Sequence, residues 1–203
     1  MKKLLLALFL ALFLVGCSDD ATKDVNQNAN QEFKEGDKIT LKSVTGNDLT
    51  IVRTQKGFKI ENSDKILMID IFGTFCVPCQ TEAPHLMDFQ LKNKDDFTIV
   101  GLIEYEEVAN DYIIDNFVKK YNAYYFIANS KDNPNKAIIN QILKDLNYQH
   151  ALSLPFKVIY NKDGILEKLT NFSKPKGEYF YLGTVKTSTL EEDFNRIKNA
   201  NKN

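Results

Sequence analysis

The stretch ILMIDIFGTFCVPC, residues 66–79, decides the fold of this 203-residue chain. It opens with an apolar run, Ile66–Phe72, of the kind that forms a buried central strand. A Cys-x-x-Cys pair follows, and apolar residues recur at helical spacing after it. The stretch therefore predicts a strand, a short turn and a helix whose first turn carries the thiols of Cys76 and Cys79.

Two thiols in this position can exchange electrons. A Cys-x-x-Cys pair across the first turn of a helix brings its sulfurs close enough to form a small disulfide. Pro78 suits that turn because its φ is fixed and the amide it lacks would have no intrahelical partner. The helix dipole lowers the pKa of the Cys76 thiol, which predicts that Cys76 is the nucleophile. Cys79, one turn deeper, would then resolve the mixed disulfide formed between Cys76 and a partner.

Two other chemistries use cysteines in similar patterns. Cys-x-x-Cys is also half of a zinc site, but the chain offers only Cys17, His85 and His150 as further sulfur or imidazole ligands. A peroxidatic cysteine is usually preceded by Thr or Ser three residues earlier, and Gly73 occupies that position. Both alternatives are less favoured than a redox-active pair, and we expect no resident metal.

The N-terminus has the pattern of a secretory signal, predicted at residues 1–16. A basic start, Met1-Lys2-Lys3, precedes the apolar run Leu4–Val15, which is short for a membrane-spanning helix. The sequence Leu14-Val15-Gly16-Cys17 resembles a bacterial lipobox, which implies a lipid on Cys17. The alternative is an ordinary signal peptide that ends near a cysteine. Lipidation would remove the third thiol and leave Cys76 and Cys79 as the pair.

The rest of the chain divides into a polar segment and one domain. Residues 17–37 are rich in Asp, Asn, Gln and Lys and are predicted to form a flexible tether, or alternatively an extended arm of the domain. Residues 38–200 are enough for a single core. The net charge of −1, with mixed signs throughout, gives no support for nucleic-acid binding.

The domain is predicted to be α/β. A hairpin over residues 49–60 leads into the core, and strands and helices then alternate. The predicted strands are 66–72, 97–103, 124–128, and a closing hairpin of 156–160 and 165–169; the predicted helices are 78–92, 108–121, 135–146 and 188–197. This order predicts a thioredoxin-like fold, in which a mixed central sheet is flanked by helices, with an N-terminal β-hairpin and a central insertion.

Residues 70–84 resemble the active-site segment of the TlpA/ResA branch of thioredoxin-like proteins. The pattern there is an apolar strand, Trp-Cys-x-Pro-Cys, two residues, Glu, one residue and Pro. Here Phe75 stands in place of the Trp. The resemblance covers about residues 38–198 and implies a membrane-tethered thiol-disulfide oxidoreductase with no cofactor beyond its redox-active disulfide.

The resemblance also implies a substrate-binding surface around the dithiol. A cis proline in this fold faces the Cys-x-x-Cys, and Leu154-Pro155 matches that position. Phe75 precedes the first thiol, and Val77 and Pro78 lie between the two. We expect these three residues, together with Leu154 and Pro155, to contact a bound polypeptide. Leu154 is bulkier than the Thr or Val expected there, which predicts a narrower choice of peptides.

Two acids are candidates for proton transfer. Glu82 matches the acidic residue of the family, although a first-turn glutamate also simply suits a helix dipole. Asp70 matches the buried acid of thioredoxins, and a carboxyl inside an apolar strand should have a raised pKa and could act as a general base toward Cys79. Either acid could do this work.

These observations predict a lipid-anchored, extracytoplasmic reductase on the periplasmic side of a membrane. The family resemblance implies that its partners are disulfide-bearing exported proteins, such as apocytochrome c with its haem-site cysteines, and a membrane thiol donor of the DsbD/CcdA type. An oxidase or isomerase of the same fold remains an alternative. Another is a metallochaperone that binds Cu(I) through both thiolates and His150.

Overall fold

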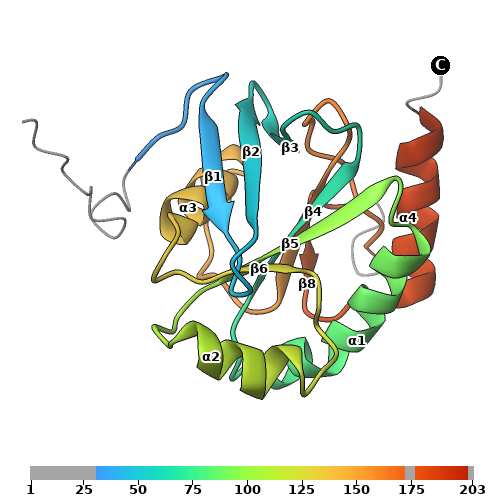
Figure 1. The fold of residues 1–203 in the computed structure, drawn as a ribbon. Helices are drawn as coiled ribbons and strands as arrows, with labels where there is room; N and C mark the ends of the chain where they lie inside the picture. The colour runs from blue at the N-terminus through green and yellow to red at the C-terminus, as the bar shows by residue number, and fades with distance from the viewer. Residues whose placement is uncertain (1–30, 172–176, 201–203) are drawn as a thin grey trace, which may run out of the picture.

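The fold is described by a computed structural model over residues 31–171 and 177–200 (Figure 1). The predicted signal peptide, Cys17 and most of the predicted tether lie outside the described residues. Within the described ranges, none of the helices has the length and apolar character needed to span a bilayer.

The centre of the domain is a mixed five-stranded sheet in the order β6-β5-β4-β7-β8. Three strands are parallel: β4 (Ile66–Phe72), β5 (Phe97–Ile103) and β6 (Phe126–Ala128). β7 (Phe156–Tyr160) runs antiparallel to β4, and β8 (Tyr181–Leu182) pairs antiparallel with β7 at the edge. The predicted α/β class and mixed sheet are confirmed.

Strand β4 is buried on both faces because each face is covered by a different layer. Its residues Leu67, Ile69 and Ile71 join a core cluster with helix α3 (Asn135–Asp145). Met68 and Phe72 alternate with them and belong to the opposite cluster. Asp70 therefore points to the same face as Met68 and Phe72.

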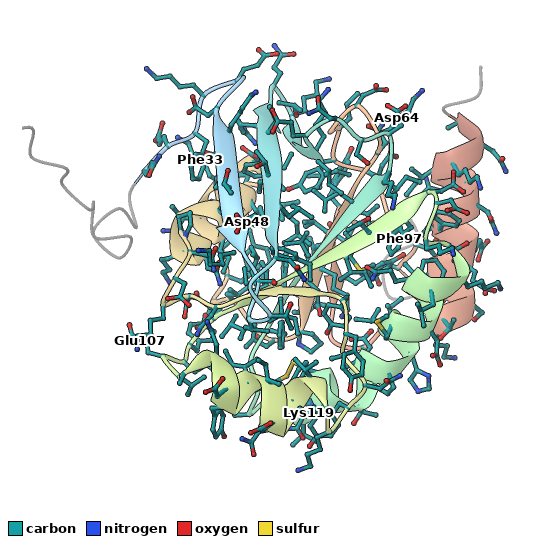
Figure 2. All side chains as sticks on the ribbon, viewed as in Figure 1. Phe33, Asp48, Asp64, Phe97, Glu107 and Lys119 are labelled. Atoms are coloured by element: carbon teal, nitrogen blue, oxygen red, sulfur yellow. A yellow bond between two sulfur atoms is a disulfide. The ribbon has the colours of Figure 1, made fainter. Side chains whose placement is uncertain are left out.

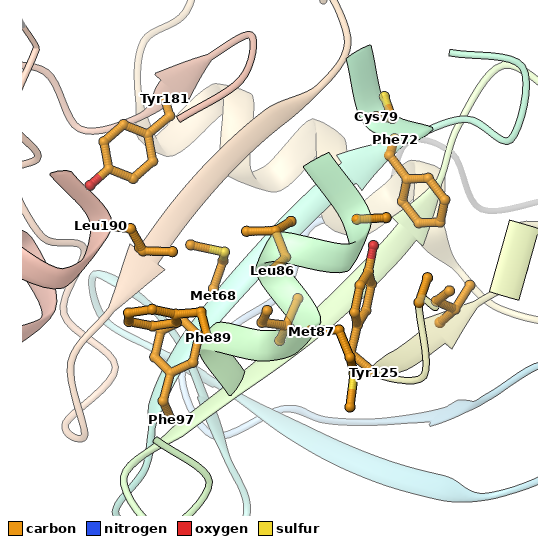
Figure 3. Packing of buried hydrophobic residues seen from close by; sticks show 14 of the residues in the cluster. Met68, Phe72, Cys79, Leu86, Met87, Phe89, Phe97, Tyr125, Tyr181 and Leu190 are labelled. Atoms are coloured by element: carbon orange, nitrogen blue, oxygen red, sulfur yellow. The ribbon is translucent and has the colours of Figure 1, made fainter. Parts of the chain in front are cut away.

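That opposite face is covered by α1 (Val77–Lys92), α4 (Thr187–Ala200) and the central insertion (Figure 1). The insertion contains α2 (Asn110–Ile113) and one π-helical stretch, η2 (Ile114–Val118), and ends in β6. Its helical part, residues 110–118, is shorter than the helix predicted over 108–121. In Figure 3, Cys79 and Phe72 lie at one end of this cluster, while Phe89 and Phe97 pack edge-to-face at the other.

A second sheet of three antiparallel strands covers the α3 side of the core. It consists of β1 (Lys38–Lys42), β2 (Asp48–Thr54) and β3 (Gly57–Ile60). The predicted N-terminal hairpin is β2–β3, whereas β1 was not predicted. Arg53 of β2 forms a bidentate ion pair with Asp145 at the end of α3, which ties this sheet to the helix.

The segment before β1 packs against the domain from Phe33 onward. The Phe33 ring is 7% exposed and meets the Phe58 ring edge-to-face. Its backbone N–H donates to the Gln141 side chain of α3, and it lies beside β1 and α3 (Figure 2). At least this part of residues 17–37 is an arm of the domain.

The predicted second strand of the closing hairpin is wrong. Residues 165–169 make only single bridges, Tyr160 to Leu166 and Leu169 to Glu178. The side chain of Asn161 accepts hydrogen bonds from the backbone N–H groups of Asp163 and Ile165, which stabilises a compact turn instead. The edge position beside β7 is taken by β8.

Candidate functional site

A disulfide lies at the start of α1. Cys76 and Cys79 are joined with an S–S distance of 2.04 Å and are 7% and 4% exposed. Cys76 is the N-cap residue, and its sulfur accepts a hydrogen bond of 3.3 Å from the Cys79 N–H. When the bond is reduced, the free N–H groups of this first turn favour a thiolate on Cys76. Pro78 fits this first turn because a backbone N–H at its position would have no partner within the helix, and proline lacks that N–H.

The loop that leads into α1 is held by a carboxylate from another loop. Glu106, beyond the end of β5, accepts from the Thr74 backbone N–H at 2.5 Å and from the Thr74 hydroxyl at 2.6 Å. The Gln80 side chain donates to the Thr74 carbonyl from the helix side at 2.7 Å. These contacts fix the backbone two residues before Cys76. This role of Glu106 could not be predicted from the sequence, since the two loops meet only in the folded chain.

The Leu154–Pro155 peptide bond is cis, as the resemblance implies. Pro155 is buried and directly precedes β7, and its carbonyl accepts a hydrogen bond from the Gly183 N–H after β8. Leu154 is partly buried and packs against both core clusters.

Apolar side chains next to the disulfide are left open to solvent. Phe75 is 57% and Val77 66% exposed, and Pro78 is exposed too. Tyr105, also exposed, donates from its hydroxyl to the Leu152 carbonyl near Pro155. The predicted substrate-contacting residues Phe75, Val77 and Pro78 are therefore accessible to a partner.

Asp70 is the most perturbed acid near the disulfide. Burial raises its pKa to about 7, the positive charge of Lys157 lowers it, and the charge of Glu82 raises it further. One of its oxygens, Oδ1, is buried without a hydrogen-bond partner. The predicted rise in the pKa of Asp70 is thus supported, with desolvation as its main cause.

Glu82 lies one turn beyond Cys79 and is 4% exposed. Its Oε1 accepts a hydrogen bond of 2.7 Å from the Val185 N–H, and its Oε2 lies 2.7 Å from the Lys157 ammonium. Lys157, the second residue of β7, is 0% exposed and also donates to the Gly183 carbonyl at 2.9 Å. The carboxylate predicted from the family pattern is therefore half of a buried ion pair.

Sequence reasoning missed Lys157. Its signal was a lysine inside the apolar strand Phe156–Tyr160, where a cation is buried only if it has a partner. The partner, Glu82, could not be named from the sequence, because it lies on α1 and meets Lys157 only where that helix packs over the sheet.

A buried phenol adjoins the two acids. The charges of Asp70 and Glu82, together with burial as the larger cause, raise the pKa of Tyr125 well above its usual value. Figure 3 shows its ring on the Phe72 side of the cluster, with the hydroxyl directed toward that end. Tyr125 is therefore a neutral group at physiological pH.

The two histidines are exposed. His85 lies on the outer face of α1, and the His150 ring contacts Tyr148 edge-to-face. Over residues 31–171 and 177–200, no three His, Cys, Asp or Glu side chains are grouped so as to hold a metal ion.

No protein-family model matches the chain. Among curated proteins, the thiol-disulfide oxidoreductase ResA of Bacillus thuringiensis is 27% identical over 117 residues, which cover 56% of this chain and 61% of the relative. ResA of Bacillus cereus strain ZK is 26% identical over 123 residues, 59% of this chain and 64% of the relative. The chain thus spans less than two thirds of the length of these curated relatives.

Among solved structures, StoA from Bacillus subtilis matches 77% of this chain and 96% of its own, with a TM-score of 0.51 and 17% identity. A thiol:disulfide interchange protein from Chlorobium tepidum matches 83% of this chain and 98% of its own, with a TM-score of 0.53 and 14% identity. At these identities the likeness concerns the fold, which is thioredoxin-like.

Proposed function

We propose that this chain, a ResA/TlpA-like protein with a thioredoxin fold, is a thiol-disulfide oxidoreductase that uses Cys76 and Cys79. The observation that carries the proposal is the Cys76–Cys79 disulfide at the first turn of α1, bordered by exposed Phe75 and Val77. A helix start favours the nucleophilic thiolate, and an apolar border suits a polypeptide substrate.

The reaction transfers two electrons. In the reductive direction, the Cys76 thiolate attacks one sulfur of a substrate disulfide, forms a mixed disulfide and releases the other substrate sulfur as a thiolate. Cys79 loses its proton and attacks the Cys76 sulfur. The Cys76–Cys79 bond forms, the mixed disulfide breaks, and the second substrate sulfur leaves as a thiolate. Two protons complete the substrate dithiol, and the protein leaves oxidised.

The cell biology proposed for this activity rests on the N-terminal sequence and on the family resemblance. The chain would be a lipoprotein anchored through Cys17, outside the cytoplasm, and would reduce disulfides of exported proteins. Apocytochrome c is the substrate that the resemblance favours. A membrane thiol donor of the DsbD/CcdA type would then return two electrons to the Cys76–Cys79 disulfide.

Disulfide exchange with a peptide tests the activity directly. The reduced protein should reduce insulin disulfides, and Cys76→Ser should abolish the reaction because the nucleophile is lost. Cys79→Ser should instead accumulate a mixed disulfide at Cys76, detectable by mass spectrometry. Equal adduct formation by both single variants would contradict the assigned roles.

The direction of electron flow in cells needs a separate measurement. Acid quenching followed by thiol alkylation shows the redox state of the Cys76–Cys79 pair by its electrophoretic shift. A reductase should be found largely reduced while its electron donor is present. A fully oxidised pair at steady state would instead favour the oxidase alternative.

A further inference from the structure

We propose that Lys157 is a positioning residue for proton transfer: it holds Glu82 in an ion pair and so leaves Asp70 as the proton acceptor for Cys79. This inference rests on the proposed function and deepens it. It starts from a buried cation to which neither the residue pattern nor the family resemblance assigned a role.

Lys157 is surrounded by protein on all sides. Register places it between Asp70 of β4 and Tyr181 of β8, on the sheet face covered by α1. Its ammonium lies 2.7 Å from Glu82 Oε2 of α1 and donates to the Gly183 carbonyl at 2.9 Å. A fully buried lysine persists only when its charge is matched, so the ion pair with Glu82 is a condition of this packing.

The remaining titratable groups on this face are accounted for. The Tyr181 hydroxyl donates to Asp193 of α4 at 2.5 Å, and burial and this bond raise its pKa, so it stays neutral. Tyr125 is likewise neutral. Two further carboxylates lie nearby and are bonded elsewhere: Asp193 to Tyr181 and Arg196, and Glu106 to Thr74. The charges that act on Asp70 are those of Lys157 and Glu82.

The two carboxyl groups differ in what their oxygens face. One oxygen of Glu82 accepts the Val185 N–H and the other faces an ammonium, so a proton there would displace a cation and a donor. Asp70 Oδ1 and Glu82 Oε2 are both buried without a hydrogen bond, but Glu82 Oε2 lies 2.7 Å from an ammonium, whereas Asp70 Oδ1 has no such contact among the described residues. Burial keeps the pKa of Asp70 close to 7, where gain and loss of a proton are equally easy.

Lys157 also connects Glu82 to the segment around the cis proline, Pro155, where a peptide is expected to bind. It bonds the carbonyl of Gly183, and the N–H of the same residue donates to the carbonyl of Pro155. One side chain thus joins Glu82 of α1 to the segment that carries the cis proline.

The step assigned to Asp70 is the proton loss that precedes resolution. The Cys79 thiol gives its proton to the Asp70 carboxylate, and the Cys79 thiolate attacks the Cys76 sulfur of the mixed disulfide. The new bond joins Cys76 to Cys79, the partner sulfur leaves as a thiolate, and two electrons pass from the dithiol to the partner. Lys157 takes no part in bond making.

The first test measures Asp70 itself and needs no activity. In the oxidised protein with ¹³C-labelled Asp carboxyls, Asp70→Asn identifies the Asp70 signal, and its titration is then followed in Lys157→Met, Glu82→Gln and the double variant. Loss of the cation should move the midpoint upward by about 1–3 pH units. Glu82→Gln should move it downward, and the double variant should return it toward the wild-type value.

The double variant also guards against a folding failure. Lys157→Met alone leaves Glu82 buried without its partner, whereas removing both charges leaves a neutral core that is expected to fold. Lys92→Met is the matched control, since it removes a lysine from an ion pair with Glu191 at the far end of α1. An unmoved Asp70 midpoint in Lys157→Met, with Lys92→Met also unmoved, overturns the proposal.

The second test measures the resolving step. The reduced protein is mixed with 5,5′-dithiobis(2-nitrobenzoate), which places thionitrobenzoate on Cys76, and release of that thiolate on Cys79 attack is followed by stopped-flow absorbance. At pH 7, Lys157→Met should slow release by about fivefold or more, because Asp70 is mostly protonated in this variant at that pH. The release rate should recover as pH rises and Asp70 loses its proton. Lys92→Met should match the wild type.

The outcomes separate the two proposals. A wild-type rate and pH profile in Lys157→Met overturns the role of Lys157 and leaves the proposed function standing. Failure of the wild type and Lys92→Met to release the Cys76 adduct, with Cys79 free, overturns the proposed function. A pH profile that persists in Asp70→Asn contradicts Asp70 as the acceptor.

Discussion

Asp70 is a single carboxyl whose burial should be visible in the stability of the whole domain. In the folded state its pKa is raised from 3.8 to about 7. Below pH 4 both folded and unfolded chains hold the proton, so the group has no effect. Between pH 4 and 7 the unfolded chain loses the proton first, so the free energy of unfolding falls as pH rises.

Asp70→Asn should therefore stabilise the protein at pH 8 and change little at pH 4. The gain at high pH should approach about 4 kcal/mol, the free energy that corresponds to this rise in pKa. Urea unfolding of the oxidised protein across this pH range measures it. A gain that is the same at pH 4 and pH 8 would show that Asp70 is not the titrating group.

The candidate site could be predicted at those residues whose role depends on local sequence. These are the two cysteines, the proline between them and Glu82. All four lie at the N-cap or in the first two turns of α1, so their spacing in the sequence is enough to place them. Lys157 and Glu106 reach the site from distant parts of the chain. Their roles depend on strand register and on loop packing, which no single stretch of sequence encodes.

At the scale of elements, the contact between Glu106 and Thr74 holds the active-site loop against the loop after β5. Glu106→Gln should lower the free energy of unfolding by about 1.5–3 kcal/mol, because two hydrogen bonds to a charged group are weakened. Thermal or denaturant unfolding measures this loss. Glu107→Gln is the matched control, since this neighbour is exposed, and it should have little effect; equal losses would contradict the assignment.

The ion pair between Arg53 and Asp145 joins the three-stranded sheet to α3. Arg53→Met should destabilise the domain by about 3–5 kcal/mol, because it leaves a partly buried carboxylate without its partner. Replacing both residues, as in Arg53→Met with Asp145→Leu, should cost less than the single change. Chemical denaturation measures the free energy of unfolding of both variants. A double variant less stable than Arg53→Met would contradict the assigned role of the ion pair.

The elements differ in how far sequence could predict them. Strands 66–72 and 97–103 agree with β4 and β5 because a continuous apolar run has few alternatives in a sheet buried on both faces. The closing hairpin was wrong after residue 160. Its second half alternates well enough for a strand, but the side chain of Asn161 closes a tight turn and the edge position goes to the two residues of β8.

At the scale of the whole molecule, the proposed lipid on Cys17 predicts where the protein is found. The wild type should sediment with membranes, and Cys17→Ala should appear in the soluble extracytoplasmic fraction, because the acyl chains that hold it are lost. Cell fractionation with labelled palmitate measures both location and lipidation. Cys76→Ala serves as the control and should remain with the membrane; a membrane-bound Cys17→Ala would contradict the lipidation.

With the proposed lipid on Cys17, the packing of Phe33 would limit how far this part of the domain can move from the membrane. Between Cys17 and the buried ring of Phe33, the chain can extend no more than about 55 Å. A domain tethered within this reach of the bilayer would meet other membrane-bound proteins at an effective concentration on the order of millimolar. Weak, brief encounters would then suffice for turnover, so the small exposed border formed by Phe75 and Val77 would not need to bind such partners tightly.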